Sequence, residues 1–343
     1  MSNVKTLSDR IILDHGTGGL LSRTLIEEVV IPALGDRYLG RMEDSSILEL
    51  ASNKIALTTD SFVVDPVFFH CGDIGKISVC GTVNDLAVSG ATPLYLTLSL
   101  IIETGFPISD LYQILSSAAK AAEEAHVYIV AGDTKVVGEG AADKIFINTS
   151  GIGVFGKKSH VLSSNKIALN DDIIITGCIG NHSIHLLSLR EGLGFESKVL
   201  SDCAPLNQMI SNIVDNFGDR IHCIRDITRG GLATVLNEIS SDISAGISID
   251  ISKVPIQHET KMAAELLGLD PLYLANEGCC CIFCAPDVTT QVLSVLREHP
   301  YGRMAARIGK VDSTFSSSVT GIYENGVRKP IECLVGLPLP RLC

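Results

Sequence analysis

Positive charge is in short supply in this chain, which carries 27 lysine and arginine residues against 39 aspartate and glutamate residues, for a formal net charge of −12. Proteins that bind nucleic acid or an anionic membrane surface need basic patches, so this balance argues against both as the main partner. A small polyanion such as ATP remains compatible with an acidic chain, because a metal ion and backbone amides can supply a local positive field.

We also expect no secretory leader and no membrane span. Its first ten residues are polar, whereas a signal peptide needs an apolar core. The apolar segment 77–102 is broken by residues that a membrane span disfavours, namely Gly81, Asn84, Asp85, Gly90 and Pro93. Eleven cysteines in 343 residues do not indicate a disulfide framework, which is typical of small secreted domains. We therefore expect reduced thiols in a cytoplasmic protein.

Length and periodicity predict two α/β domains and a tail, with boundaries at 1–157, 158–330 and 331–343. In the second half, predicted strands alternate with predicted helices, and a run of Lys, Ser and Asn after residue 156 marks the boundary between the domains. Glu324-Asn325-Gly326-Val327 predicts a hairpin turn shortly before the tail.

Three aspartates occur at the edges of predicted buried elements. Asp60 ends a predicted strand that begins at Lys54, and Asp133 follows the apolar run 127–131. Asp85 is the only charged residue between Lys76 and Glu103, and it lies on a predicted helix whose apolar side chains cover nearly its whole circumference. A buried carboxylate needs a cation or several donors, and Mg²⁺ prefers such oxygen ligands, so we predict a magnesium site from these three residues. The alternative is that Asp85 is satisfied by backbone amides or a distant arginine.

Two glycine-containing segments precede predicted helices. Asp14-His15-Gly16-Thr17-Gly18-Gly19 comes before a helix predicted at 20–31, and its amide groups suit a phosphate unless the segment is only a turn. A later predicted helix begins after Arg225-Asp226-Ile227-Thr228-Arg229-Gly230-Gly231. Asp226 and Thr228 either cap this helix, or the two arginines bind a phosphate or a carboxylate at its N-terminus.

Three further patterns do not carry the function that they suggest. Residues 151–156 match the dinucleotide-binding glycine pattern, but no apolar-periodic helix follows. Gly72, Gly75 and Lys76 lack the spacing and the hydroxyl of a P-loop. Cys279, Cys280 and Cys281 alternate faces of a predicted strand, so they cannot meet one zinc ion and are expected to pack as small hydrophobic residues.

The last six residues, Pro338-Leu339-Pro340-Arg341-Leu342-Cys343, place a thiol on a proline-stiffened arm. Extended, the arm from Pro330 reaches on the order of 40 Å, far enough to bring Cys343 into a distant pocket. The alternative is a frayed end with an incidental thiol.

Several of these stretches together resemble the HypE family of hydrogenase-maturation carbamoyl dehydratases, within the superfamily of aminoimidazole ribonucleotide synthetase and selenophosphate synthetase. The matching stretches span nearly the whole chain: 15–19, 59–66, 72–87, 132–137, 225–231, Asn276-Glu277-Gly278 and the Pro-Arg-x-Cys ending. One departure is His70-Cys71, where the family usually has Pro-Gly. The change affects a loop near Lys76, makes Cys71 sensitive to oxidation, or is neutral.

The resemblance implies an α/β (α+β) fold of two domains, of the aminoimidazole ribonucleotide synthetase type, with a flexible tail. It implies that a carbamoyltransferase, HypF, loads a carboxamide onto Cys343 and that ATP and Mg²⁺ drive its dehydration to a thiocyanate. It also implies a homodimer and delivery of cyanide to a HypC–HypD iron scaffold.

Site roles follow from the same resemblance. Cys343 is the carrier, Glu277 or Lys135 is the base, and Asp60, Asp85 and Asp133 hold the metal. The expected ATP-binding residues are Gly16, Gly18, Gly19, Asp60, Lys76, Asn84, Asp85, Asp133, Asp226 and Arg229. The alternatives are another ATP-dependent enzyme of the superfamily, such as a selenophosphate synthetase or a purine cyclo-ligase, and a non-enzymatic scaffold that offers its thiol.

Overall fold

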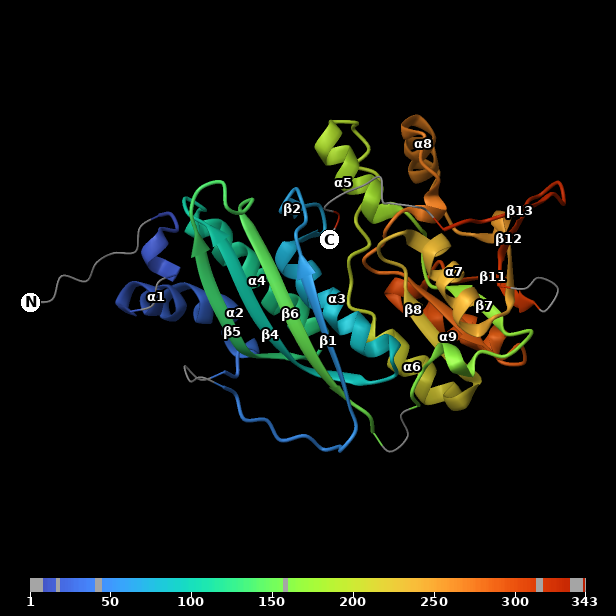
Figure 1. The fold of residues 1–343 in the computed structure, drawn as a ribbon, viewed down its shortest axis with the longest axis horizontal. Helices are drawn as coiled ribbons and strands as arrows, with labels where there is room; N and C mark the ends of the chain where they lie inside the picture. The colour runs from blue at the N-terminus through green and yellow to red at the C-terminus, as the bar shows by residue number, and fades with distance from the viewer. Residues whose placement is uncertain are drawn as a thin grey trace, which may run out of the picture.

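The fold is described from a computed structural model, which covers residues 9–16, 19–40, 45–156, 160–312, 317–333 and 342. Two large β-sheets, each packed against helices, lie side by side, and helix α3 runs between them (Figure 1). In the part of the chain that is described, no helix is long and apolar enough to cross a membrane.

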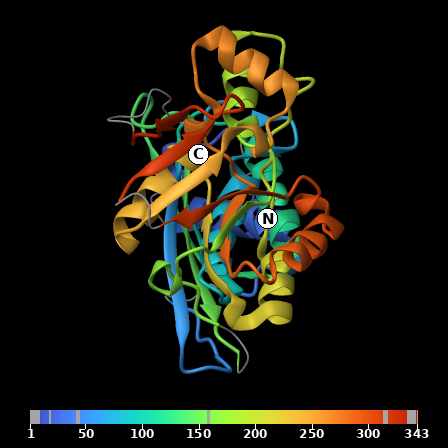
Figure 2. The same ribbon diagram turned by 90° about the vertical axis from the view of Figure 1, so that its right-hand side faces the viewer.

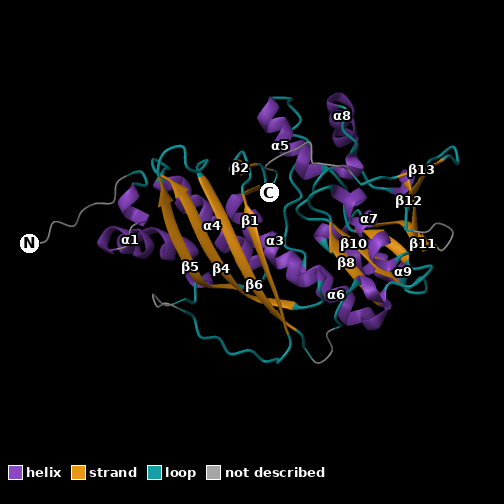
Figure 3. Ribbon diagram, viewed as in Figure 1, coloured by secondary structure: helices purple, strands orange, loops and turns teal. Residues whose placement is uncertain are grey.

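The N-terminal sheet has the strand order β1-β6-β4-β5, with β4 and β5 parallel and the other neighbours antiparallel. Its strands are β1 (Ile55–Phe62), β4 (Thr92–Glu103), β5 (Tyr128–Val137) and β6 (Ile145–Val154), and a short pair, β2 (Phe68–Phe69) and β3 (Gly72–Asp73), precedes α3. The helices of this half are α1 (Gly19–Leu25), α2 (Ile31–Leu34), α3 (Ile74–Val88) and α4 (Ile108–Glu124). Helices α3 and α4 lie behind the four strands in Figure 3, and none of the described helices covers the near face.

Helix α3 is buried along its length, as its apolar circumference predicts. Asp73 caps its first turn by accepting a hydrogen bond from the Lys76 N–H at 3.0 Å. Gly75 permits close contact with α4, because a Cβ there would lie 2.1 Å from the carbonyl oxygen of Ile114. The predicted helix at 20–31 is instead divided into α1, a π-helical turn (Ile26–Val30) and α2, which contains Pro32. Proline has no N–H to continue the α-helical hydrogen-bond pattern.

The C-terminal sheet has the order β13-β12-β9-β11-β7-β10-β8. Its strands are β7 (Asp172–Ile175), β8 (Ile221–Asp226), β9 (Gly246–Asp250), β10 (Cys280–Cys284), β11 (Ala306–Asp312), β12 (Val319–Ile322) and β13 (Arg328–Pro330). Its helices are α5 (Asn181–Glu191), α6 (Asn207–Phe217), α7 (Gly231–Ile243), α8 (His258–Leu267) and α9 (Thr289–Glu298). Figure 2 shows α5 and α8 together at one end of the molecule. The hairpin predicted at Glu324–Val327 is confirmed: it joins β12 to β13, and Gly326 has a φ of 75°.

Strand β10 explains the run of cysteines. Cys279 and Cys281 face one apolar cluster, while Cys280 and Cys284 face another on the opposite side of the sheet. Burial raises the pKa of each of these thiols above its usual value. The prediction that they pack as small hydrophobic residues is confirmed.

Hydrogen bonds join the two halves where α3 meets the segment before α6. The amide nitrogen of Asn84 donates to the Ala204 carbonyl at 3.1 Å, and its amide oxygen accepts from the Leu206 N–H at 2.7 Å. Asn207 donates to the carbonyl of Ala125 at 2.8 Å. Because these bonds are buried, they fix the junction at which the candidate site lies.

Candidate active site

Three carboxylates converge on the junction from β1, α3 and the end of β8. Asp60 accepts a hydrogen bond from the Thr82 hydroxyl at 3.1 Å, and Asp85 accepts one from the Thr58 hydroxyl at 2.8 Å. Asp226 comes from the C-terminal domain, and its charge acts on Asp85 together with that of Asp60. The fold therefore brings three predicted site residues, far apart in sequence, into one acidic cluster.

The cluster carries more negative charge than its surroundings neutralise. Burial raises the pKa of Asp85 to about 7, and the charges of Asp226 and Asp60 add to that shift. Burial also raises the pKa of Asp226, against the opposing effect of Arg225. Closely placed carboxylates of this kind suit Mg²⁺, which binds to one or two carboxylates and completes its shell with water and phosphate oxygens.

The third predicted metal ligand, Asp133, lies elsewhere. Strand β5 does not end at Ala131, as expected, but continues to Val137, so Asp133 and Lys135 both point to the open face of the sheet. Asp60 lies on the opposite, helix-covered face at the other edge, three strand spacings or about 14 Å away. Among the described residues, no group of three His, Cys, Asp or Glu side chains is placed to hold one metal ion. One copy of the chain therefore does not assemble the predicted three-aspartate site.

Glu277 lies beside the acidic cluster and is almost fully buried, with 3% of its surface exposed. Its Oε1 atom has no hydrogen-bond partner among the described residues. Burial raises its pKa well above the usual value, and the thiol of Cys203 and the carboxylate of Asp202 contribute in the same direction. A buried carboxyl group without its full set of partners suits proton transfer better than it suits packing.

Asp202 holds Glu277 in place and was not anticipated from the sequence. Its carboxylate accepts the Glu277 N–H at 3.0 Å and the side-chain amide of Asn276 at 2.9 Å. Asn276 in turn accepts the N–H of Gly180 at 3.1 Å. Asp202 belongs to no periodic element and to none of the motifs above, so nothing in the local sequence marks it.

Leu342, the last described residue, lies at this junction. Leu342 is 6% exposed and belongs to the same apolar cluster as Leu186, Cys203 and Ala275. Its carbonyl oxygen accepts a hydrogen bond from Nε2 of the buried His182 at 2.7 Å. Cys343, the predicted carrier, lies outside the described residues. His182 was also missed in the sequence, since α5 gives no sign of its partner 160 residues away.

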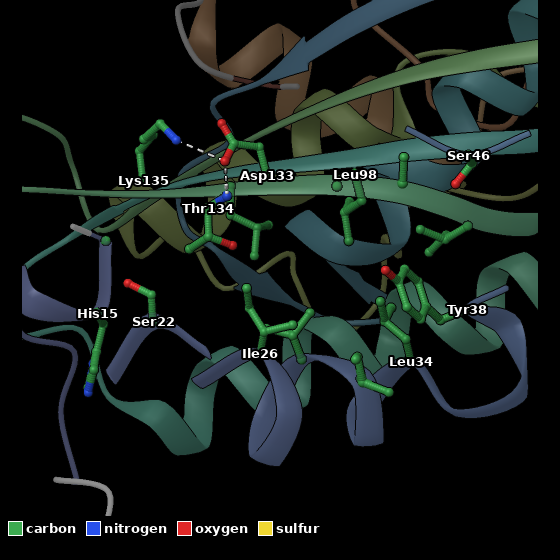
Figure 4. A pocket seen from close by; sticks show the side chains of 17 residues that line it. His15, Ser22, Ile26, Leu34, Tyr38, Ser46, Leu98, Asp133, Thr134 and Lys135 are labelled. Carbon is green, nitrogen blue, oxygen red and sulfur yellow. Dashed lines mark hydrogen bonds and ion pairs between the residues drawn. The ribbon is translucent and has the colours of Figure 1, made fainter. Parts of the chain in front are cut away.

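A cavity of about 570 Å³ lies between the N-terminal helices and β5 (Figure 4). It is lined by His15, Gly16, Ser22, Ile26, Leu34, Tyr38, Leu98 and Thr134, among others. A Cβ on Gly16 would lie 2.3 Å from the backbone nitrogen of Val136, so only glycine fits this contact. Of the other predicted glycines, Gly19 is the first residue of α1 and Gly18 lies outside the described residues.

Asp133 and Lys135 also border this cavity. Their side chains point to the open face of the sheet, away from the helices (Figure 4). Lys135 Nζ lies 2.9 Å from Asp133 Oδ1, and both side chains are exposed. The hydrogen bond from Lys135 lowers the pKa of Asp133. The β5 edge thus combines a cavity, a glycine-dependent contact and an exposed ion pair.

The remaining predicted residues occupy different places. Lys76 donates to the Cys71 carbonyl at 3.0 Å, and its distance from Asp85 along α3 is nine residues, or about 14 Å. Cys71 is exposed with a φ of 70°, a left-handed conformation that glycine adopts more readily. The side-chain nitrogen and the side-chain oxygen of Asn84 each bond to the backbone, as described, which gives Asn84 a structural role. Arg229 is exposed next to Asp226 and lowers its pKa by its charge.

The two halves match models of the AIR synthase related proteins: the N-terminal domain over residues 42–155 and the C-terminal domain over residues 170–322. The chain is thus an AIR synthase related protein by fold and by both domains. Carbamoyl dehydratase HypE of Azotobacter vinelandii is 40% identical over 343 residues, with 100% of each chain covered. Carbamoyl dehydratase HypE of Escherichia coli K12 is 38% identical over 340 residues, with 98% of this chain and 100% of its own covered.

Two solved structures extend the comparison. Hydrogenase maturation protein HypE in complex with ATP superposes with a TM-score of 0.92 at 41% identity, covering 97% of this chain and 99% of that one. HypE in a HypE–HypF complex superposes with a TM-score of 0.79 at 45% identity, covering 90% and 99%. The chain belongs to the HypE family of carbamoyl dehydratases. The predicted family and the predicted two-domain α/β fold are both confirmed.

Proposed function

We propose that this chain is an ATP-dependent carbamoyl dehydratase that converts an S-carboxamide on Cys343 into a thiocyanate, a cyanide donor for the iron of [NiFe]-hydrogenase. The observation that carries the proposal is the burial of Leu342 at the junction that also holds Glu277 and the acidic cluster. The next residue in the chain is one peptide unit, about 3.8 Å, further on. A group attached to Cys343 would thus begin close to the buried carboxyl groups.

The chemistry requires activation of a poor leaving group. An amide oxygen leaves readily only after it has attacked the γ-phosphorus of ATP, which releases ADP and forms an O-phosphorylated imidate. Loss of inorganic phosphate then gives the thiocyanate, and the two amide hydrogens leave as protons. When bound, Mg²⁺ would neutralise charge on the transferring phosphoryl group. Asp60 and Asp85 would hold the ion. Asp226 would add negative charge beside it, and the nearby Arg229 would partly offset the charge of Asp226.

Glu277 is suited to accept one of the two protons. Its buried Oε1 lacks a partner, and a raised pKa brings a carboxyl group toward the working pH of a general base. Asp202 holds its backbone, so the side chain is directed by a fixed main chain. The burial of Leu342 beside this site would also help to exclude water, which hydrolyses the imidate.

In this proposal, a second copy of the chain supplies the β5 edge of the site. That edge carries Lys135, the second proton acceptor, and the residues that bind the nucleotide. Gly16, Asp133 and Lys135 lie at the β5 edge, whereas Asp60 and Asp85 lie at the β1 edge. The open sheet face between them carries exposed apolar side chains, with Leu57 at 70%, Ile55 at 46% and Ile101 at 43%. A homodimer through this face would cover them and bring opposite edges of two sheets together.

The comparison with the HypE–HypF complex supports a HypF-type carbamoyltransferase as the loading partner. Delivery to a HypC–HypD iron scaffold and a cytoplasmic location complete the proposal. The domain boundaries 1–157, 158–330 and 331–343 are part of it, and the family models at 42–155 and 170–322 support the first two.

The direct test is intact-mass spectrometry of the full chain after incubation with the carbamoyltransferase, ATP and Mg²⁺. We expect the carboxamide adduct to lose one water, with the product mapped to Cys343. Cys343→Ala should take up no adduct. Formation of the nitrile in that variant would refute the carrier role.

Mixing two inactive variants tests the composite site. Asp85→Asn alters the β1 edge and Lys135→Met alters the β5 edge, so each variant alone should be inactive. After subunit exchange, half of the dimers are mixed and have one intact site, which should restore about one quarter of the normal activity. A site contained in one chain would give no recovery.

A further inference from the structure

His182 is the buried contact of the C-terminal segment. It is the second residue of α5 and is fully buried, with no exposed surface. Its Nε2 atom lies 2.7 Å from the Leu342 carbonyl oxygen, and its Nδ1 atom lies 2.8 Å from the Ser201 hydroxyl oxygen. Both ring nitrogens therefore have partners, and one of these partners belongs to the tail.

The partners determine which nitrogen carries the proton. A carbonyl oxygen only accepts, so Nε2 must be the donor to Leu342. Burial lowers the pKa of His182, which favours the neutral ring, so Nδ1 must accept from the Ser201 hydroxyl. The Ser201 oxygen also accepts the Cys203 N–H at 3.2 Å, which orients the hydroxyl toward the ring. Ser201 thus holds His182 in the tautomer that binds the tail.

The surroundings of the ring hold it for this contact. Phe69 meets His182 edge-on at 5.7 Å, and the Leu342 side chain packs into the same apolar cluster as Phe69 and Leu186. If the tail leaves, Nε2 loses its hydrogen-bond partner within an apolar pocket, which is unfavourable. Docking of Leu342 is therefore favoured by both its side chain and its carbonyl.

We propose that His182 and Ser201 are positioning residues that hold the C-terminal segment through the main-chain carbonyl before Cys343. The inference rests on the proposed function, because it assigns them to delivery of the loaded cysteine. Since the bond is made to the backbone, the chemical state of the next side chain does not alter it. The same contact serves the free thiol, the carboxamide and the thiocyanate.

His185 provides a matched control. It lies three residues further along α5, is also fully buried, and faces Phe69 and His70. Its Nδ1 contacts the Val199 carbonyl at 2.7 Å, and its Nε2 accepts the His70 N–H at 3.0 Å, so neither nitrogen contacts Leu342. A change at His185 disturbs the same helix and the same cluster but leaves the tail contact in place.

The test measures thiol alkylation in the full chain without ATP. N-ethylmaleimide labelling at Cys343 is followed by peptide mass spectrometry and compared with the exposed Cys333. We expect His182→Ala to accelerate labelling of Cys343 by about two- to tenfold, because the variant loses one net hydrogen bond to the tail. The labelling rate of Cys333 should not change. His182→Gln, which retains a donor, should restore part of the protection, and His185→Ala should leave the rate unchanged.

Leu342→Ala changes only the tail and so separates docking from folding of α5. It should also accelerate labelling of Cys343. Equal rates in the wild type, His182→Ala and Leu342→Ala would overturn the proposal, as would equal acceleration by His185→Ala. In the loaded chain, His182→Ala should lower the dehydration rate by a similar factor with an unchanged KM for ATP. If labelling behaves as expected but no variant forms thiocyanate, tail docking stands and the proposed function fails.

Discussion

Replacing Asp85 with asparagine should stabilise the metal-free protein at neutral pH. The folded state raises the pKa of Asp85 from 3.8 to about 7, mainly by burial and then through the charges of Asp226 and Asp60. Between these two values the folded chain binds more protons than the unfolded chain, so stability falls as pH rises from about 4 to 7. Asparagine removes this penalty and can still accept the hydrogen bond from Thr58.

The size of the effect follows from the pKa shift. About three units at 1.36 kcal/mol each give an upper limit of about 4 kcal/mol. Asp85 retains some contact with water, and its neighbours relax when one charge is removed, so we expect about 2 kcal/mol at pH 8. Near pH 4, where the carboxyl group is protonated, the variant and the wild type should have similar stability.

Urea unfolding between pH 4 and 8.5 in EDTA, followed by circular dichroism because the chain has no tryptophan, would measure this difference. Asp133→Asn is the control: its ion pair with Lys135 lowers the pKa of Asp133, so that substitution should not stabilise. Mg²⁺ with ATP should stabilise the wild type more than Asp85→Asn. A variant that is less stable than the wild type at pH 8 without metal would refute the charge argument.

Three further predictions concern other parts of the site. Glu277→Gln should raise the melting temperature at pH 8, because burial raises the pKa of Glu277. The same variant should slow dehydration by about 100-fold or more in the intact-mass assay, and retained activity would exclude Glu277 as the base. Gly16→Ala should weaken ATP binding about tenfold by calorimetry, since its Cβ would meet the β5 backbone, whereas Gly138→Ala, with open space, should not. Leu57→Asp should give an inactive monomer in analytical ultracentrifugation, and the similarly exposed Leu266→Asp on α8 a normal dimer.

Local patterns predicted the elements of the fold well. The all-round apolar surface of α3, the alternation of the cysteines on β10 and the Asn-Gly turn of the β12–β13 hairpin each depend on residues near one another in sequence. The N-terminal helices were predicted less well, because the pattern at 20–31 contains no signal for a π-helical turn. Side-chain periodicity reports the face of an element but not its hydrogen-bond register.

The site was predicted only in part, and the end of β5 shows why. Expecting that strand to end at residue 131 placed Asp133 at a strand terminus, where carboxylates of neighbouring strands meet. The strand continues to Val137, so Asp133 follows the alternation of a strand and lies on the open face. Asp60 likewise lies within β1 and not at its end. An error of a few residues in a strand end thus decides which face carries a charge.

His182, Ser201 and Asp202 could not have been found from local sequence, because their partners are set by tertiary contacts across the domain junction. Their roles nevertheless follow from an accounting of buried polar groups. Asp202 and Ser201 direct buried donors and acceptors toward Glu277 and His182, yet Oε1 of Glu277 still has no partner among the described residues. A fold selected for stability alone would not bury like charges and an unpaired carboxyl oxygen. The proposed function would supply the missing partners near the buried Leu342: a cation for the carboxylates and the group attached to Cys343 for Glu277.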